Sequence, residues 1–465
     1  MAFSHMHIFS LTLTLLAVAA IGLYSARKVK SAADFAVSGR SSGVVLISGT
    51  ITGTIIGGTA TIGTAQLAYS IGLSAWWYTL GSGIGFIIMG LFYARPLRQS
   101  ALETIPQFLV HHYGEMAGPI ASLISSIGIF FGIMASLLPA VTLITAIFNV
   151  STFTAVCICI VLVVAYVFFG GVWGAGLAGI LKLIIIYLTL AISGVIAWSA
   201  MGGLTGIVST FPVFPWFSLI GRGGWLDVAS LLSLVVGILS TQTYIQAIYA
   251  ARDTQTARTG SLVAAAMTIP VGLPSVLVGM YMSLHYPSIA PIDALPLFII
   301  NNLPDWLGGL AIGGLILSTV GSAAGLALGI GTMISRDIVS GIFHYTNDCG
   351  LLWINRGFVL LIAFSAAFCA FGNMNSLVLE WGILSMSLRG SSIILPLSFA
   401  IFLPGKLSSR WAIYSMLLGA VIALLTKILY SGGLDPLFSS LLASMAVILV
   451  GVIKDAKKHT DILDQ

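Results

Sequence analysis

The stretch ITGTIIGGTATIGT, residues 51–64, decides how this chain folds. It occupies the middle of an apolar segment, 43–70, that is long enough to cross a bilayer. Glycine and threonine alternate with apolar residues there, and Gly57-Gly58 is a poor pair inside a helix. We predict an interrupted helix, because unpaired backbone groups are tolerated at membrane depth only beside a protein cavity. Close packing of small residues against a neighbouring helix is the alternative interpretation.

The composition of the whole chain indicates a membrane protein. Of the 465 residues, 58% are hydrophobic and 7% are charged, whereas a soluble domain carries roughly 25% charged residues. The 19 basic and 14 acidic side chains give a net charge of +5, too little for a surface that follows nucleic-acid phosphates. Water-soluble, disordered and nucleic-acid-binding classes are therefore excluded. The fold class that remains is all-α integral membrane, with about 13 transmembrane helices.

Most lysines and arginines lie in alternate connections between the expected spans. Because cytoplasmic connections carry the excess of basic residues, this places the N-terminus outside and the C-terminus in the cytoplasm. This pattern predicts a multi-pass protein of the cell membrane, plasma or inner, with the lipid bilayer as its surroundings. The expected spans are 6–26, 43–70, 74–94, 118–148, 153–170, 174–200, 226–251, 260–286, 306–335, 352–372, 376–403, 410–431 and 434–453.

Two further spans carry polar groups that are costly in a membrane unless they face a wet cavity. The seventh contains a run from Gly237 to Gln246 that includes Gln242 and Tyr244. The ninth contains Ser318 and Ser322, which lie four residues apart and therefore share one helix face. Hydroxyls at that spacing can complete an oxygen shell around a hard cation, or they can simply pack between helices.

Two cations lie inside expected spans. Lys182 is followed by an apolar run and either faces the interior or extends its amine to the cytoplasmic surface. Arg389 sits among small polar residues of the eleventh span. Its guanidinium matches the geometry of a carboxylate, which belongs either to a substrate or to a structural partner such as Glu380.

Interrupted helices favour alternating access over a continuous pore, so a channel is the less favoured hypothesis. A solute sensor is a further alternative. An enzyme is not expected, because no nucleophile–base set or metal spacing is present. The glycines of 174–179 match the spacing of a dinucleotide-binding loop, but no strand precedes them.

At these residues the chain resembles the sodium:solute symporter family. The resemblance rests on several ordered pieces: DFAVSGR at 34–40, AYSIG at 68–72, TIPQFL at 104–109, the glutamines of the seventh span before AARD at 250–253, and Ser335 with Asp337-Ile338. It implies thirteen helices with a leucine-transporter-like core of two inverted five-helix repeats. The implied division is a first helix and loop at 1–42, core segments at 43–251 and 252–405, and two peripheral helices with a short tail at 406–465.

In that family a sodium ion lies between the broken second helix and the ninth helix. The resemblance places its ligands at Gly53, Ile56, Ser318 and Ser322. A further family ligand corresponds to Gly321, which has no side-chain oxygen. The family's Trp-Thr-Asp-x-x-Gln sequence corresponds to LAGILK at 177–182, which replaces the acid by glycine and the glutamine by Lys182.

We therefore expect a symporter that imports a small organic solute, favoured to be a carboxylate or amino acid because the buried cations make the cavity positive. The coupling ion is expected to be Na⁺, or H⁺ if Lys182 takes the role of sodium; no other cofactor is expected. The protein is expected to function as a monomer. Lys182 is the coupling candidate, and the substrate-binding candidates are Gly57, Thr59, Gln242, Tyr244 and Arg389.

Overall fold

A computed structural model describes every residue except 1–3, 28–30, 168–170, 373–375, 430–435 and 464–465. The described chain is helical, and its one β-bridge joins Ser42 to Ala251. The first eleven α-helices are α1 (His5–Ala26), α2 (Ala32–Val37), α3 (Val44–Ile55), α4 (Thr64–Ile71), α5 (Trp77–Ile88), α6 (Ala94–Gln99), α7 (Ile105–Tyr113), α8 (Ala117–Phe148), α9 (Thr152–Val167), α10 (Gly171–Ala200) and α11 (Gly203–Thr210).

The remaining α-helices are α12 (Val213–Trp216), α13 (Gly224–Leu239), α14 (Gln242–Tyr249), α15 (Thr254–His285), α16 (Ala294–Asn302), α17 (Asp305–Met333), α18 (Asp348–Phe371), α19 (Val378–Phe402), α20 (Ser409–Leu429) and α21 (Pro436–Leu463). Short 3₁₀ or π segments extend or join them: η1 (Ser38–Arg40), η2 (Thr59–Gly63), η3 (Gly72–Trp76), η4 (Met89–Tyr93), η5 (Pro291–Asp293) and η6 (Ile334–Ser340).

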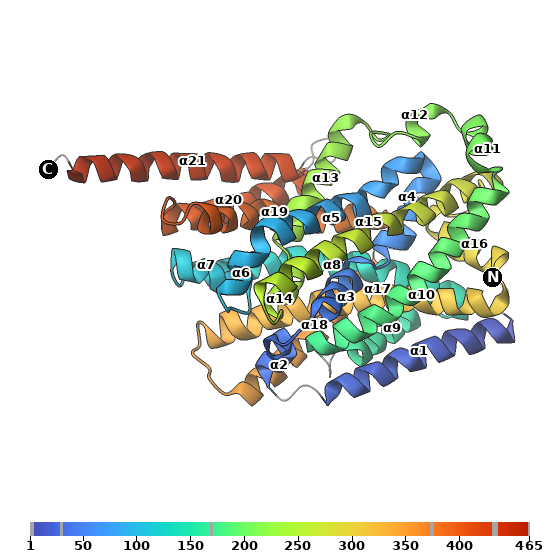
Figure 1. The fold of residues 1–465 in the computed structure, drawn as a ribbon, viewed down its shortest axis with the longest axis horizontal. Coiled ribbons are helices and arrows are strands. Elements are labelled where there is room, and N and C mark those ends of the chain that lie inside the picture. The colour runs from blue at the N-terminus through green and yellow to red at the C-terminus, as the bar shows by residue number, and fades with distance from the viewer. Residues whose placement is uncertain (1–3, 28–30, 168–170, 373–375, 430–435, 464–465) are drawn as a thin grey trace.

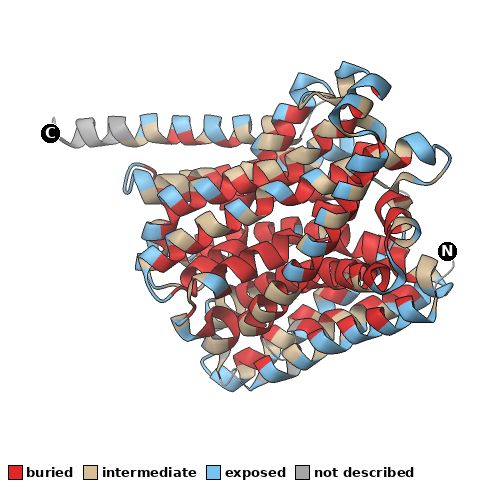
Figure 2. Ribbon diagram, turned by 45° about the vertical axis from the view of Figure 1, so that its right-hand side comes forward, coloured by how far each residue is buried: buried red, intermediate tan, exposed pale blue. Residues whose placement is uncertain are grey.

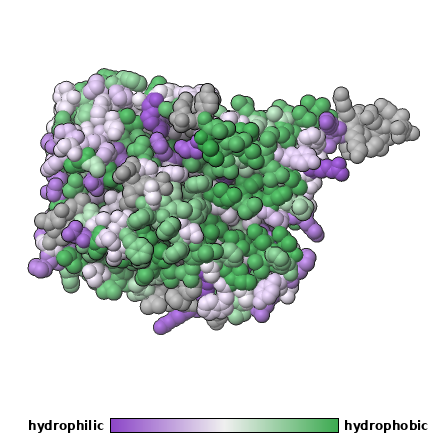
Figure 3. Space-filling view, turned by 180° about the vertical axis from the view of Figure 1, so that it is seen from behind, coloured by the Kyte–Doolittle hydropathy of each residue, from purple (hydrophilic) through white to green (hydrophobic). Residues whose placement is uncertain are grey.

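The membrane-spanning character expected from the sequence is present in these helices. Within the described ranges, nine helices are long and apolar enough to cross a membrane, or ten if the bent pair α13–α14 counts as one span. Shorter apolar helices, His5–Ile21, Val44–Ile55 and Thr152–Tyr166, fall where further spans are expected. Figure 3 shows apolar side chains over a broad area of the surface, as a protein surrounded by lipid requires.

Burial separates the central helices from the peripheral ones. The apolar windows of α17, α19 and α8 are 94%, 83% and 78% buried, whereas those of α20 and α21 are each 28% buried. The buried residues gather in the middle of the bundle in Figure 2. Helix α21 runs along the edge and extends beyond the other helices, so the two termini lie at opposite ends of the molecule in Figure 1.

Both interruptions that the sequence predicts are present. Helix α3 ends at Ile55, and Ile56 has the non-helical angles φ −80° and ψ 77°. The chain then continues through η2 into α4. Helices α13 and α14 meet at an angle of 41° around Ser240 and Thr241.

Candidate functional site

The break after α3 meets the serine-bearing face of α17. The Ser318 hydroxyl donates a hydrogen bond of 2.5 Å to the carbonyl oxygen of Ile56, the first non-helical residue. Gly57 approaches Ser322 so closely that a β-carbon on it would lie 2.3 Å from the serine Oγ. The predicted encounter of these two segments is therefore present, and Gly57 is needed because any side chain would separate them.

Lys182 reaches this meeting point from α10. Its side chain is fully buried. The ammonium Nζ lies 3.1 Å from the Ser318 carbonyl oxygen and 3.5 Å from the Ser322 Oγ. The amine therefore points to the interior and does not extend to the bundle surface. No ion pair of Lys182 is found among the described residues.

The two departures from the family pattern have a structural basis. Gly179 is the position where the resemblance places the acid of many relatives, and a β-carbon on it would lie 2.5 Å from the Gly49 carbonyl oxygen and 3.2 Å from the Gly53 Cα. Helices α3 and α10 are thus in backbone contact there, and an aspartate does not fit. At Gly321 a β-carbon would lie 2.6 Å from the Tyr166 ring, so this tyrosine occupies the space of the missing hydroxyl residue.

A small cavity adjoins the break. Its free volume is about 10 Å³, room for about one water molecule, so a solute requires the surrounding helices to move apart. None of its lining residues is acidic. They are Thr54, Ile55, Gly57, Thr59, Tyr78, Gly132, Ser136, Tyr244, Ser322, Leu326, Gly382, Ser385, Met386 and Arg389.

Arg389 lies against this cavity and has few partners. Its Nη1 donates to the Ser385 Oγ at 2.8 Å, and Nη2 approaches the Met386 sulfur at 2.8 Å. Its buried Nε has no hydrogen-bond partner in the described chain. The described residues provide no carboxylate partner for it, and Glu380 is exposed. A guanidinium carries five N–H donors, so Arg389 retains capacity to bind an anionic group.

Four of the five predicted substrate-binding residues line the cavity: Gly57, Thr59, Tyr244 and Arg389. Gln242 does not. Its amide accepts a bond from the Ile105 N–H and donates to the Glu103 carbonyl oxygen, both at 2.9 Å. The predicted cation ligands Ile56, Ser318 and Ser322 lie together, while Gly53 packs against Gly179.

Several lining residues were not singled out from the sequence. A β-carbon added to Gly132 of α8 would lie 2.8 Å from the Ser385 Oγ and 3.6 Å from the Arg389 Nη1. Gly128, one turn earlier, is similarly close to the Arg389 backbone. Gly128 and Gly132 lie four residues apart on one face of α8. Such a pair of small residues indicates close helix packing, and it could have identified α8 as the helix that contacts Arg389.

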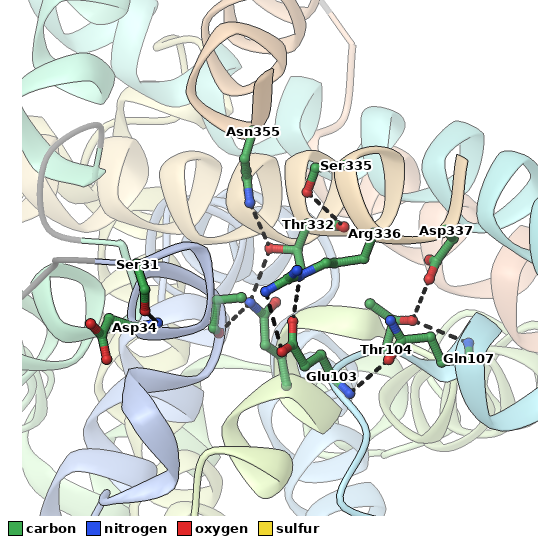
Figure 4. A network of polar contacts seen from close by, with 12 residues as sticks. Ser31, Asp34, Glu103, Thr104, Gln107, Thr332, Ser335, Arg336, Asp337 and Asn355 are labelled. Atoms are coloured by element: carbon green, nitrogen blue, oxygen red, sulfur yellow. Dashed lines mark hydrogen bonds and ion pairs between the residues drawn. The ribbon is translucent and has the colours of Figure 1, made fainter. Parts of the chain in front are cut away.

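A polar network joins the loop between α6 and α7 to η6 (Figure 4). Arg336 and Glu103 form an ion pair with 2.7 Å between Nε and Oε2, and both side chains are largely buried. The Thr104 hydroxyl donates to the Asp337 carboxylate at 2.6 Å. These contacts hold the loop between α6 and α7 against η6 in the described conformation.

Broken helices that enclose a polar cavity inside an apolar bundle define the class of multi-span membrane transporters by their fold. The model of the sodium:solute symporter family matches residues 35–419. The chain therefore belongs to the sodium:solute symporter family, as its residues predict.

Three curated relatives show how far the similarity extends. The chain is 26% identical to a Drosophila melanogaster high-affinity choline transporter, over 78% of this chain and 61% of the relative. It is 24% identical to the human protein of that name, over 79% and 68%. It is also 24% identical to the osmoregulated proline transporter OpuE of Bacillus subtilis, over 96% and 94%. The chain thus spans less than two thirds of the Drosophila relative.

Solved structures share the fold. A Na⁺-coupled sialic acid symporter has a TM-score of 0.83 at 16% identity, with 97% of each chain covered. The nucleobase-cation-symport-1 family transporter MHP1 has a TM-score of 0.61 at 11% identity, over 91% of this chain and 95% of the other.

Proposed function

We propose that this protein is a cation-coupled symporter that imports a small solute bearing a carboxylate, such as an amino acid or organic acid. The observation that carries the proposal is Arg389. Its buried guanidinium lies against the cavity and uses only a serine hydroxyl and a thioether as described hydrogen-bond partners. Leaving a buried charge without a counterion is costly, and an incoming carboxylate would relieve that cost.

The same charges argue against a cationic solute such as choline. Arg389 lines the cavity, and no lining residue is acidic. The Lys182 amine lies 3.5 Å from the Oγ of Ser322, which is itself a lining residue. A quaternary ammonium group would therefore meet positive charge, with the rings of Tyr78 and Tyr244 but no carboxylate to offset it. A zwitterion such as proline has a carboxylate for Arg389 and backbone or hydroxyl oxygens near Gly57 and Thr59 for its amine.

Two coupling cations are candidates. Sodium is the ion that the family favours, with ligands expected at Gly53, Ile56, Ser318 and Ser322 if the Lys182 amine does not occupy that place. A proton is favoured by the Lys182 ammonium at that place, since a buried lysine can release and rebind a proton. Uptake into proteoliposomes under a sodium gradient alone or a pH gradient alone distinguishes the two.

Binding of unlabelled solutes to the purified protein tests the proposed substrate class. We expect amino acids or organic acids to raise the melting temperature, because a ligand that binds only the folded state stabilises it. Choline and neutral sugars are expected to leave it unchanged. A shift caused by choline alone would overturn the carboxylate assignment.

A further inference from the structure

The place between the α3 break and α17 is already occupied by the side-chain amine of Lys182. Lys182 Nζ contacts the Ser318 carbonyl oxygen at 3.1 Å and the Ser322 Oγ at 3.5 Å. Ser318 in turn links that contact to the freed Ile56 carbonyl oxygen. Carbonyl and hydroxyl oxygens are the ligands that hard cations take in proteins. Here one carbonyl oxygen and one hydroxyl oxygen contact the amine of a lysine from the chain itself.

We propose that the Lys182 ammonium is a tethered replacement for the sodium ion at this site, and that the site excludes Na⁺ for as long as the amine is present. The role of this site in transport rests on the proposed function. The occupancy itself rests on the contacts of Lys182 and can be measured without any solute.

Three features of the surroundings support exclusion. The oxygens nearest to Nζ are neutral, and the position of the family's acid, Gly179, has no room for a side chain. Tyr166 occupies the space beside Gly321, so a third hydroxyl is missing from α17. A sodium ion would therefore lie beside a fixed ammonium of like charge, without a carboxylate to offset the repulsion.

The proposal also predicts what removal of the amine does. The oxygens of Ile56, Ser318 and Ser322 belong to the α3 break and to α17. We therefore expect them to stay in place when the Lys182 side chain is shortened. In Lys182→Ala the site would lose its charge and gain space. A mobile cation of suitable size could then occupy it, so the variant is expected to acquire a sodium response that the natural protein lacks.

The test is binding of ²²Na⁺ to purified protein in detergent, with melting temperatures in NaCl and KCl at equal ionic strength as a second measurement. We expect no saturable ²²Na⁺ binding to the natural protein and equal melting temperatures in both salts. We expect Lys182→Ala to bind ²²Na⁺ saturably and to melt on the order of 2–4 °C higher in NaCl than in KCl.

Two matched variants make the result specific. Lys182→Met removes the charge but keeps most of the volume, so we expect less sodium binding than in Lys182→Ala. Lys182→Ala combined with Ser322→Ala is expected to lose the acquired binding. The proposal would be overturned if the natural protein bound ²²Na⁺ saturably and if Ser318→Ala or Ser322→Ala abolished that binding. This comparison does not need Lys182→Ala, so it remains decisive if that variant does not fold. A protein that excludes sodium but transports no carboxylate would instead contradict only the proposed function.

Discussion

Arg389 illustrates how one residue can determine what a cavity accepts. Its side chain is held by Ser385, whose own hydroxyl donates to the Gly128 carbonyl oxygen at 2.6 Å. This chain of bonds fixes the direction of the guanidinium while leaving N–H groups for another partner. An arginine positioned in this way offers a carboxylate two parallel hydrogen bonds, which a lysine cannot do.

Substitution of Arg389 tests its role as the carboxylate anchor. We expect Arg389→Gln to weaken binding of the transported carboxylate roughly 10- to 100-fold, since a hydrogen bond to a charged group contributes about 1.5–3 kcal/mol. Arg389→Lys should weaken binding less, because the charge remains but the paired geometry is lost. Solute titrations monitored by melting temperature measure both effects.

The matched control removes an exposed positive charge from the end of the bundle. Arg410→Gln is expected to leave solute affinity unchanged, because Arg410 is exposed and does not line the cavity. If Arg389→Lys binds the solute as tightly as the natural protein does, the paired hydrogen bonds are not the basis of recognition.

The charged residues of the site could be predicted from sequence because a lysine or arginine within an apolar span is rare. Their partners could not. Snorkelling and burial of Lys182 are both compatible with its position in the chain, and only the packing of α10 against α17 distinguishes them. The prediction for Gln242 failed for another reason. A polar run in a span predicts a wet cavity, but this amide forms hydrogen bonds with backbone groups of Glu103 and Ile105.

At the scale of elements, the crossing of α3 and α10 positions the lysine. Gly49 and Gly53 on α3 face Gly176 and Gly179 on α10. Such small residues allow two helix backbones to approach closely in a membrane. Lys182 lies one turn beyond this contact, so the crossing directs its side chain toward α17.

Enlarging a glycine at this crossing should destabilise the bundle. A β-carbon in Gly179→Ala would meet the Gly49 carbonyl oxygen at 2.5 Å, and overpacking of this kind costs about 1–3 kcal/mol. We expect a clearly lower melting temperature in detergent. The control is Gly357→Ala on α18, where an added β-carbon has no neighbour within 4 Å.

For the control we expect an unchanged or slightly higher melting temperature, because alanine favours a helix by up to about 1 kcal/mol over glycine. Equal melting temperatures for Gly179→Ala and Gly357→Ala would show that the α3–α10 approach is looser than described.

Helix positions followed closely from hydropathy, as α8, α17 and α19 show against the expected spans 118–148, 306–335 and 376–403. The two interruptions followed from glycine and polar runs. Sequence could not reveal that Tyr166 takes the place of a missing hydroxyl or that Gly132 makes room beside Ser385. Both depend on contacts between helices far apart in the chain, which local composition does not encode.

At the scale of the whole molecule, the helices leave little free space at the cavity. Only about 10 Å³ is free beside Arg389, and the Glu103–Arg336 pair joins two elements at the end with the basic connections. The described conformation leaves no room for a solute beside Arg389, so binding requires a rearrangement of the helices around the cavity.

Uptake of labelled solutes by proteoliposomes tests the central claim that this cavity carries a carboxylate. Proline, lactate and choline, supplied at equal concentration, sample a zwitterion, an anion and a cation. We predict that at least one carboxylate-bearing solute accumulates inside the vesicles, that choline does not, and that Arg389→Gln strongly reduces the accumulation at a concentration below saturation. Accumulation of choline without either carboxylate, or full carboxylate uptake by Arg389→Gln, would contradict the account.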